Sequence, residues 1–130
     1  MMQEKNCCPA EITLKVIGGK WKLVILWHLR DEVKRFSELK RNIPGITQRM
    51  LTQQLRELEK DGVISRKIYP QVPPRVEYSI NKFGTSLQPI LRSMCQWGIK
   101  YKKRVEALEQ HGITQQRGLR GLHHPEQALF

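Results

Sequence analysis

The chain has 130 residues, the size of one domain, and its 39% hydrophobic content is enough for one core. Its 23 Lys and Arg outnumber 12 Asp and Glu, giving a formal net charge of +11 that is typical of nucleic-acid-binding domains. The longest apolar run, Leu23 to Trp27, has five residues, so we expect no membrane-spanning helix. Residues 1–6 lack a signal peptide's apolar segment, so we expect no export. The prediction is a cytoplasmic protein without a membrane partner.

The N-terminal part predicts two helices after a flexible arm, residues 1–7. The first helix begins at Pro9, which suits the first helical position because its missing N–H needs no partner there. Ile12 contributes to a short apolar face, and Gly18-Gly19 ends the helix. The second helix, 20–29, has little polar surface, so we expect it at the centre of the core.

The middle of the chain predicts a short helix, a tight turn and a capped helix. Residues 37–43 carry one apolar stripe, and Pro44-Gly45 is a strong turn signal. Thr47 can cap a further helix that runs to Lys60 and ends before Gly62. A short helix, a turn and a second helix form the helix-turn-helix arrangement.

Beyond Gly62 the hydrophobic period changes to two, which predicts strands. Residues 63–69 are rich in β-branched side chains, and residues 75–80 alternate. The five residues between them include three prolines, which cannot continue a ladder and make a stiff tip. We expect a two-stranded hairpin, so the fold class is mainly α (α+β), a winged helix-turn-helix domain over residues 8–109.

The last predicted helix starts after Asn81, which can cap it, and carries apolar residues at steps of three and four. Over about 26 residues it would span roughly 39 Å and extend past a small domain. A second copy of the chain could cover this stripe, which predicts a homodimer; the alternative is that the stripe packs on its own core. Residues 110–130 show little periodicity and are interpreted as a disordered tail. The stripe is Leu87, Ile90, Leu91, Met94, Trp97, Tyr101, Val105 and Leu108.

The capped helix presents a polar face opposite its leucines. Arg can bond guanine and Gln can bond adenine in the major groove, and Thr can offer a hydroxyl or a methyl. An ordinary solvated face is the alternative, but the preceding turn and the following hairpin favour DNA. The buried stripe is Leu51, Leu55 and Leu58, and Lys60 lies on the polar side. The candidate DNA-contacting residues are Thr47, Gln48, Arg49, Thr52, Gln53 and Arg56.

Further cations lie on both sides of this helix. Arg75 follows two prolines that limit its backbone freedom, and we favour it as a contact to phosphates or the minor groove. Arg66 and Lys67 could do the same or form a solvated edge. Lys34 and Arg35, with Lys40 and Arg41, are candidate phosphate contacts, which position a protein without specifying sequence.

The ordered motifs of residues 8–103 resemble the HxlR-type winged-helix transcriptional regulators of bacteria and archaea. This resemblance implies a dimeric DNA-binding protein related to the MarR-like regulators, with recognition helix 47–60 and wing 63–80. The first and last helices would build the dimer interface, through Ile12, Leu91, Met94, Trp97, Tyr101 and Val105. The motifs are Cys8-Pro9, residues 17–21, 35–39 and 43–59, Asp61-Gly62 and residues 72–78.

A cysteine at the position of Cys8 senses oxidants or electrophiles in some members of the resembled family. Helix N-termini favour thiolate, so we hypothesise that Cys8 oxidation changes the dimer and its DNA binding; an inert thiol is the alternative. Cys7 could share this chemistry, and Cys95 is expected to pack as a small hydrophobe.

Catalytic and metal-binding motifs are missing from the sequence. Three cysteines are an odd number without metal-type spacing, and His28 is interpreted as a partly buried structural histidine. We predict a regulator that binds double-stranded DNA at a pseudo-palindromic operator. It is expected to catalyse no reaction and to need neither a metal nor a cofactor. A non-specific nucleic-acid or protein-docking winged helix is the alternative.

Overall fold

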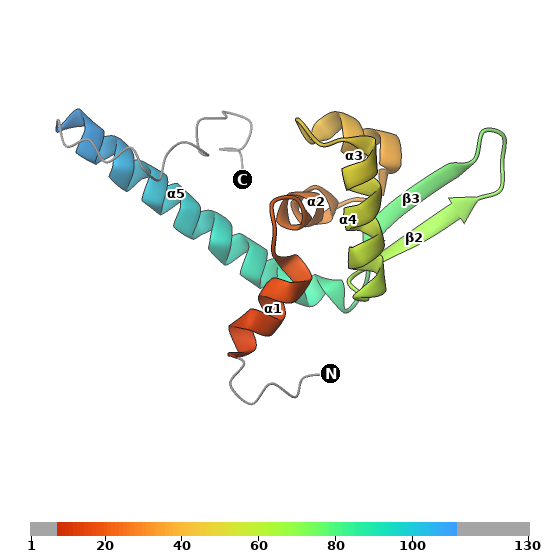
Figure 1. The fold of residues 1–130 in the computed structure, drawn as a ribbon, viewed down its shortest axis with the longest axis horizontal. Coiled ribbons are helices and arrows are strands. Elements are labelled where there is room, and N and C mark those ends of the chain that lie inside the picture. The colour runs from red at the N-terminus through yellow and green to blue at the C-terminus, as the bar shows by residue number, and fades with distance from the viewer. Residues whose placement is uncertain (1–7, 112–130) are drawn as a thin grey trace. The chain divides into compact units, whose positions relative to one another are not determined.

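A computed structural model of the chain describes residues 8–111, and the predicted arm and most of the predicted tail lie outside this range. The chain divides into two compact units at Gln88, and each is described by itself. The first unit runs from α1 to the 3₁₀ helix η1, and Figure 1 labels its α-helices and the strands β2 and β3. The elements of the first unit are α1 (Pro9–Ile17), α2 (Lys22–Leu29), β1 (Lys34–Arg35), α3 (Phe36–Asn42), α4 (Gln48–Lys60), β2 (Ile64–Tyr69), β3 (Arg75–Ile80) and η1 (Gly84–Leu87).

Helix α1 begins and ends as predicted. Pro9 is in its first turn, where Glu11 adds the negative charge that the helix dipole favours, and Gly18 follows its last residue. Helix α2 begins at Lys22, two residues after the predicted start, because Gly18 and the positive φ of Gly19 carry the chain through a bend first.

The core of the first unit lies where α2, α3 and α4 meet the sheet. Ile25 and Leu26 of α2 are fully buried, as predicted for a central helix. Leu39 and Ile43 meet this core from α3 and its C-terminal end. Removing such side chains from water contributes about 1.5–3 kcal/mol each, so this burial stabilises the packing of α2 and α3 in the core.

The turn between α3 and α4 follows the sequence signals closely. Gly45 has a φ of +82°, a left-handed conformation that costs other residues roughly 1–2 kcal/mol. The Thr47 hydroxyl accepts a hydrogen bond from the Met50 N–H at 3.1 Å and caps α4. Gly62, with a φ of +80°, follows the last turn. The predicted bounds of α4 are therefore confirmed.

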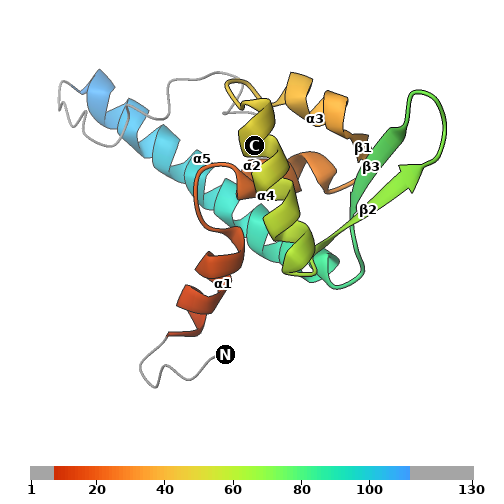
Figure 2. The same cartoon turned by 45° about the vertical axis from the view of Figure 1, so that its right-hand side comes forward.

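The wing is part of a three-stranded antiparallel sheet in the order β1-β3-β2, where the sequence predicted a two-stranded hairpin. Ile64 pairs with Ile80 at one end of the hairpin and Tyr69 with Arg75 at the other. The additional strand β1 pairs Lys34 with Tyr78, as Figure 2 shows beside β3. A two-residue strand has too few positions to show a period, so the sequence could not reveal it.

Asn81 joins the wing to the C-terminal end of α4. Its Nδ2 donates to the Gly62 carbonyl and its Oδ1 accepts from the Gly84 N–H, both at 2.7 Å. The prediction that Asn81 caps the long helix was wrong, because η1, with Phe83 as its N-cap, comes between Asn81 and the start of α5 at Gln88. There is no room for a Cβ at Gly84, which would meet the Val63 carbonyl oxygen.

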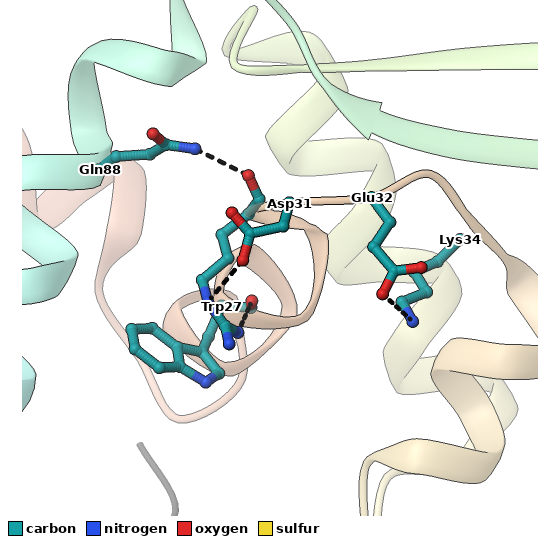
Figure 3. Close-up of polar contacts among 6 residues, drawn as sticks. Trp27, Asp31, Glu32, Lys34 and Gln88 are labelled. Carbon is teal, nitrogen blue, oxygen red and sulfur yellow. Dashed lines mark hydrogen bonds and ion pairs between the residues drawn. The ribbon is translucent and has the colours of Figure 1, made fainter.

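A polar cluster fixes the loop between α2 and β1 (Figure 3). The Arg30 guanidinium donates to the Trp27 carbonyl at 2.7 Å and lies 4.0 Å from the Trp27 ring centroid. Gln88 Nε2 donates to the Arg30 carbonyl at 2.8 Å. Further along the loop, Lys34 Nζ lies 3.6 Å from a Glu32 oxygen.

The second unit contains the rest of α5 (Gln88–Gln110) as far as the structure describes it. The helix has 23 residues, a length of about 35 Å, and it includes Pro89 in its first turn, where proline is tolerated. The rings of Trp97 and Tyr101 stack at 5.4 Å between centroids. The predicted long helix is confirmed, with a later start than expected.

Candidate nucleic-acid interface

Helix α4 turns its polar face outward because its leucines face the core. Leu51, Leu55 and Leu58 are buried, as predicted. The opposite side is exposed, apart from the half-buried Thr52 and Glu57. One open hollow collects five predicted DNA-contacting residues and one that was not predicted. Its lining is Gln48, Arg49, Thr52, Gln53, Arg56 and Glu57.

Two hydroxyls on this face are already engaged with the helix backbone. Thr47 accepts the capping hydrogen bond of α4. Thr52 Oγ1 donates to the Gln48 carbonyl at 2.8 Å. With its proton committed, the Thr52 hydroxyl can only accept from a base edge, and its methyl group is the other contact it can offer.

The two arginines of the face are not neutralised by any acid of the described residues 8–111. Across residues 8–111, no carboxylate lies within ion-pair distance of Arg49 or Arg56. Both side chains are exposed, and a guanidinium carries five donors in a planar fork. They can therefore bond guanine O6 and N7 or a phosphate without first breaking an ion pair.

Gln53 is held by a chain of contacts that the sequence reading missed. Gln53 Nε2 donates to Glu57 Oε2 at 3.2 Å, and Glu57 Oε1 pairs with Lys22 Nζ of α2 at 2.7 Å. These hydrogen bonds and the Lys22 charge lower the pKa of the Glu57 carboxyl. The spacing of Gln53 and Glu57 could have revealed the first contact; the contact with Lys22 depends on how α2 packs on α4.

Lys34 and Arg35, the predicted phosphate contacts, lie on β1. The Lys34 side chain is largely buried beside Glu32, whereas Arg35 is exposed. The Arg35 backbone N–H donates to Glu38 Oε1 at 2.9 Å. This hydrogen bond, aided by nearby Lys and Arg charges, lowers the pKa of the Glu38 carboxyl. Arg35 is the better placed of the two cations for an external anion.

The cations of the wing stem are stacked and paired. Arg75 lies 4.2 Å from the Tyr69 ring centroid, and Lys67 lies 5.0 Å from it. Arg75 also pairs with Glu77 at 3.4 Å, and Arg66 pairs with Glu59 of α4 at 3.4 Å. These contacts restrain the stem and hold the predicted contact Arg75 against Tyr69 and Glu77.

The predicted sensor Cys8 and the predicted interface residue Ile12 belong to the first unit, whereas the other predicted interface residues belong to the second. Cys8 is exposed at the N-cap of α1, and Ile12 is half-buried one turn later. On α5, Met94, Trp97 and Tyr101 are exposed, whereas Leu91 and Val105 are buried. Cys7 lies outside the described residues. Three of the five predicted α5 residues thus leave apolar surface in contact with water.

Metal-binding and membrane-spanning features are not found between residues 8 and 111. No group of three or more His, Cys, Asp or Glu side chains in this range could hold a metal ion. No helix in the same range has the length and apolar character to cross a bilayer.

A short helix, a tight turn, an outward-facing polar helix and a β-wing define a winged helix-turn-helix protein, the class of DNA-binding transcriptional regulators. The model of the HxlR-like helix-turn-helix family matches residues 16–116. The chain therefore belongs to the HxlR-like helix-turn-helix family, and it is a transcriptional regulator rather than an enzyme.

Three relatives support this assignment. The uncharacterized HTH-type transcriptional regulator YdeP of Bacillus subtilis (strain 168) is 59% identical over 78% of this chain and 80% of its own. The redox regulator HypR in its reduced form is 53% identical, with a TM-score of 0.73 over 77% of this chain and 99% of its own. The oxidised form of HypR is 58% identical, with a TM-score of 0.67 over 70% of this chain and 94% of its own. A chain described as a MarR-family regulator from Porphyromonas gingivalis W83 is 38% identical, with a TM-score of 0.69 over 76% and 95%.

Proposed function

We propose that this regulator binds a specific double-stranded DNA operator as a homodimer in the cytoplasm. Helix α4 enters the major groove, and the β2–β3 wing contacts the flanking backbone or minor groove. The observation that carries the proposal is the outward face of α4, where Arg49 and Arg56 have no acidic partner among the described residues and Gln53 presents an amide. These groups match the donor and acceptor pattern of base edges.

The exposed face of α5 supports the homodimer. Trp97 is 64% exposed and stacks on Tyr101, with Met94 exposed nearby. Large apolar side chains grouped in this way mark interaction surfaces. A symmetric dimer would bury the same patch of each protomer and bring two copies of α4 to two half-sites, so the operator would be pseudo-palindromic.

Competition binding tests the proposal. A labelled fragment from upstream of the protein's own or a neighbouring gene is titrated with protein in the presence of excess scrambled DNA. We expect the complex to survive the competitor and to weaken as salt rises, because phosphate contacts release counterions. Equal binding to both DNAs would favour the alternative, a non-specific winged-helix module, and would contradict the proposal.

Cys8 is the group we propose for a response to thiol oxidation. It is exposed at the start of α1, and HypR, a redox regulator, is similar to this chain in its reduced and oxidised forms. Two Cys8 thiols, one from each protomer, would give up two electrons and two protons to a peroxide or quinone and form one S–S bond. The bond would change the spacing of the protomers and hence DNA binding.

Matched variants test this response. Cys8→Ser should abolish the peroxide-dependent change in operator binding and the disulfide-linked dimer on non-reducing gels. Cys95→Ser, which removes the half-buried thiol of α5, should behave as the wild type. A Cys8→Ser protein that still responds to peroxide or quinone would refute the assignment of Cys8.

A further inference from the structure

A buried lysine lies behind the DNA-facing side of α4. Lys22 of α2 is 7% exposed, and a buried ammonium needs a partner to offset the loss of its hydration. Glu57 supplies it, with Oε1 at 2.7 Å from Lys22 Nζ. The carboxylate of Glu57 is thereby attached to the core on one side, while its other oxygen faces the hollow of α4.

The second oxygen of Glu57 restricts the amide of Gln53. A glutamine amide has nearly equivalent positions for its O and NH₂ ends, because the terminal torsion is broad and roughly two-fold. An ionised carboxylate only accepts hydrogen bonds. Gln53 Nε2 must therefore face Glu57, where it lies 3.2 Å from Oε2; the flipped amide would set its oxygen against the carboxylate.

The groups that remain available on Gln53 match one base edge. One N–H of Nε2 is used by Glu57, which leaves the other N–H and the Oε1 acceptor. A bidentate contact with adenine needs one donor for N7 and one acceptor for the N6 amino group. Because the orientation of the amide is fixed, the remaining N–H and the Oε1 of Gln53 follow one another in a single order along the groove.

We propose that Lys22 and Glu57 are positioning residues that fix the amide orientation of Gln53 and thereby its selection of adenine at one operator position. The inference rests on the proposed function, because it requires α4 to read base edges. Lys22 also neutralises a carboxylate that would otherwise repel phosphates. The hydrogen bonds from Lys22 and Gln53, which lower the pKa of Glu57, keep it ionised and acceptor-only at neutral pH.

Helix α4 provides a matched control. Glu59 lies on the same helix and pairs with Arg66 of the wing at 3.4 Å, and it does not line the hollow. Glu57→Gln and Glu59→Gln each remove one negative charge from α4 with almost no change in volume. Both should raise the affinity for all DNA sequences slightly, but only Glu57→Gln gives residue 57 an amide that can pair with Gln53 in either direction.

The experiment measures binding of the full chain to operators carrying each of the four bases at every position, at one salt concentration. Gln53→Ala identifies the position that Gln53 reads. At that position we expect Glu57→Gln and Lys22→Met to reduce the preference for adenine about tenfold. Adding Gln53→Ala to either variant should reduce the preference for adenine no further than Gln53→Ala does alone. Glu59→Gln should keep the wild-type preference. Thermal unfolding of every variant accompanies the measurement.

Each outcome bears on the inference. A base preference unchanged in Glu57→Gln, or changed equally in Glu59→Gln, overturns it. So does a loss of affinity that is equal for all four bases, since that indicates a purely structural role. If Gln53→Ala flattens no position while the wild type still selects its operator, the inference fails and the proposed function stands. If the wild type itself shows no base preference, both fail.

Discussion

The hydroxyl of Thr47 connects the stability of α4 to its function. It accepts the Met50 N–H at 3.1 Å at the N-terminal end of the helix, next to Gln48 and Arg49. Thr47→Ala removes this cap and should cost about 1 kcal/mol. For a domain the size of residues 8–111 that corresponds to a fall in Tm of roughly 4 °C. Operator affinity should fall as well, because fraying of the first turn displaces the two neighbouring side chains.

Differential scanning fluorimetry at one protein concentration measures the change in Tm, and titration of labelled operator measures the affinity. Thr47→Ser is the matched control, because it keeps the oxygen that accepts the capping hydrogen bond. It should retain most of the wild-type Tm and affinity. A capping role for Thr47 is contradicted if Thr47→Ala leaves Tm unchanged, or if Thr47→Ser lowers Tm as much as Thr47→Ala does.

Three further predictions concern the dimer, the DNA contacts and the pH dependence of stability. Trp97→Glu should convert the proposed dimer to a monomer in light scattering at micromolar concentration, whereas Lys100→Glu, at another exposed site on the same helix, should not; a dimer that survives Trp97→Glu argues against this interface. Arg49→Ala should relax base preference and cost about 1–3 kcal/mol of operator binding, while Arg35→Ala, at the exposed cation of β1, should weaken all sequences alike in the same titrations; the reverse pattern would contradict their roles. Burial, followed by the charges of Lys34 and Arg30, lowers the pKa of His28 below 6.5. As the pH falls, His28 is therefore protonated in the unfolded chain before it is in the folded chain, and the free energy of unfolding decreases below about pH 6.5. His28→Gln should lose less stability than the wild type in urea unfolding between about pH 7.5 and 5.5, and an equal loss would contradict this assignment.

The sequence predicted α4 well because every signal at its ends agreed with its interior. Thr47 caps it, Gly62 follows it, and three leucines at helical spacing face the core. Strand β1 was missed because two residues carry no period. The start of α5 was misplaced because the short η1, whose first N–H donates to Asn81, lies between Asn81 and Gln88.

The candidate site was predictable only as far as it lies on one element. The polar face of α4 follows from helical spacing alone. The contact between Lys22 and Glu57 joins two helices separated in sequence, and only their packing brings it about. Similarly, the sequence offered Arg75 as a contact, but the stacking on Tyr69 depends on strand register, which pairs these two residues.

A genome-wide footprint of the protein, before and after thiol oxidation, shows whether α4 reads a specific operator. We expect discrete sites with two related half-sites about 34–36 Å apart, or a multiple of that distance. Occupancy of these sites should change on oxidation in the wild type and remain constant in Cys8→Ser. Occupancy spread evenly over the genome, with no shared sequence among the bound regions, would contradict the claim that α4 reads a specific operator.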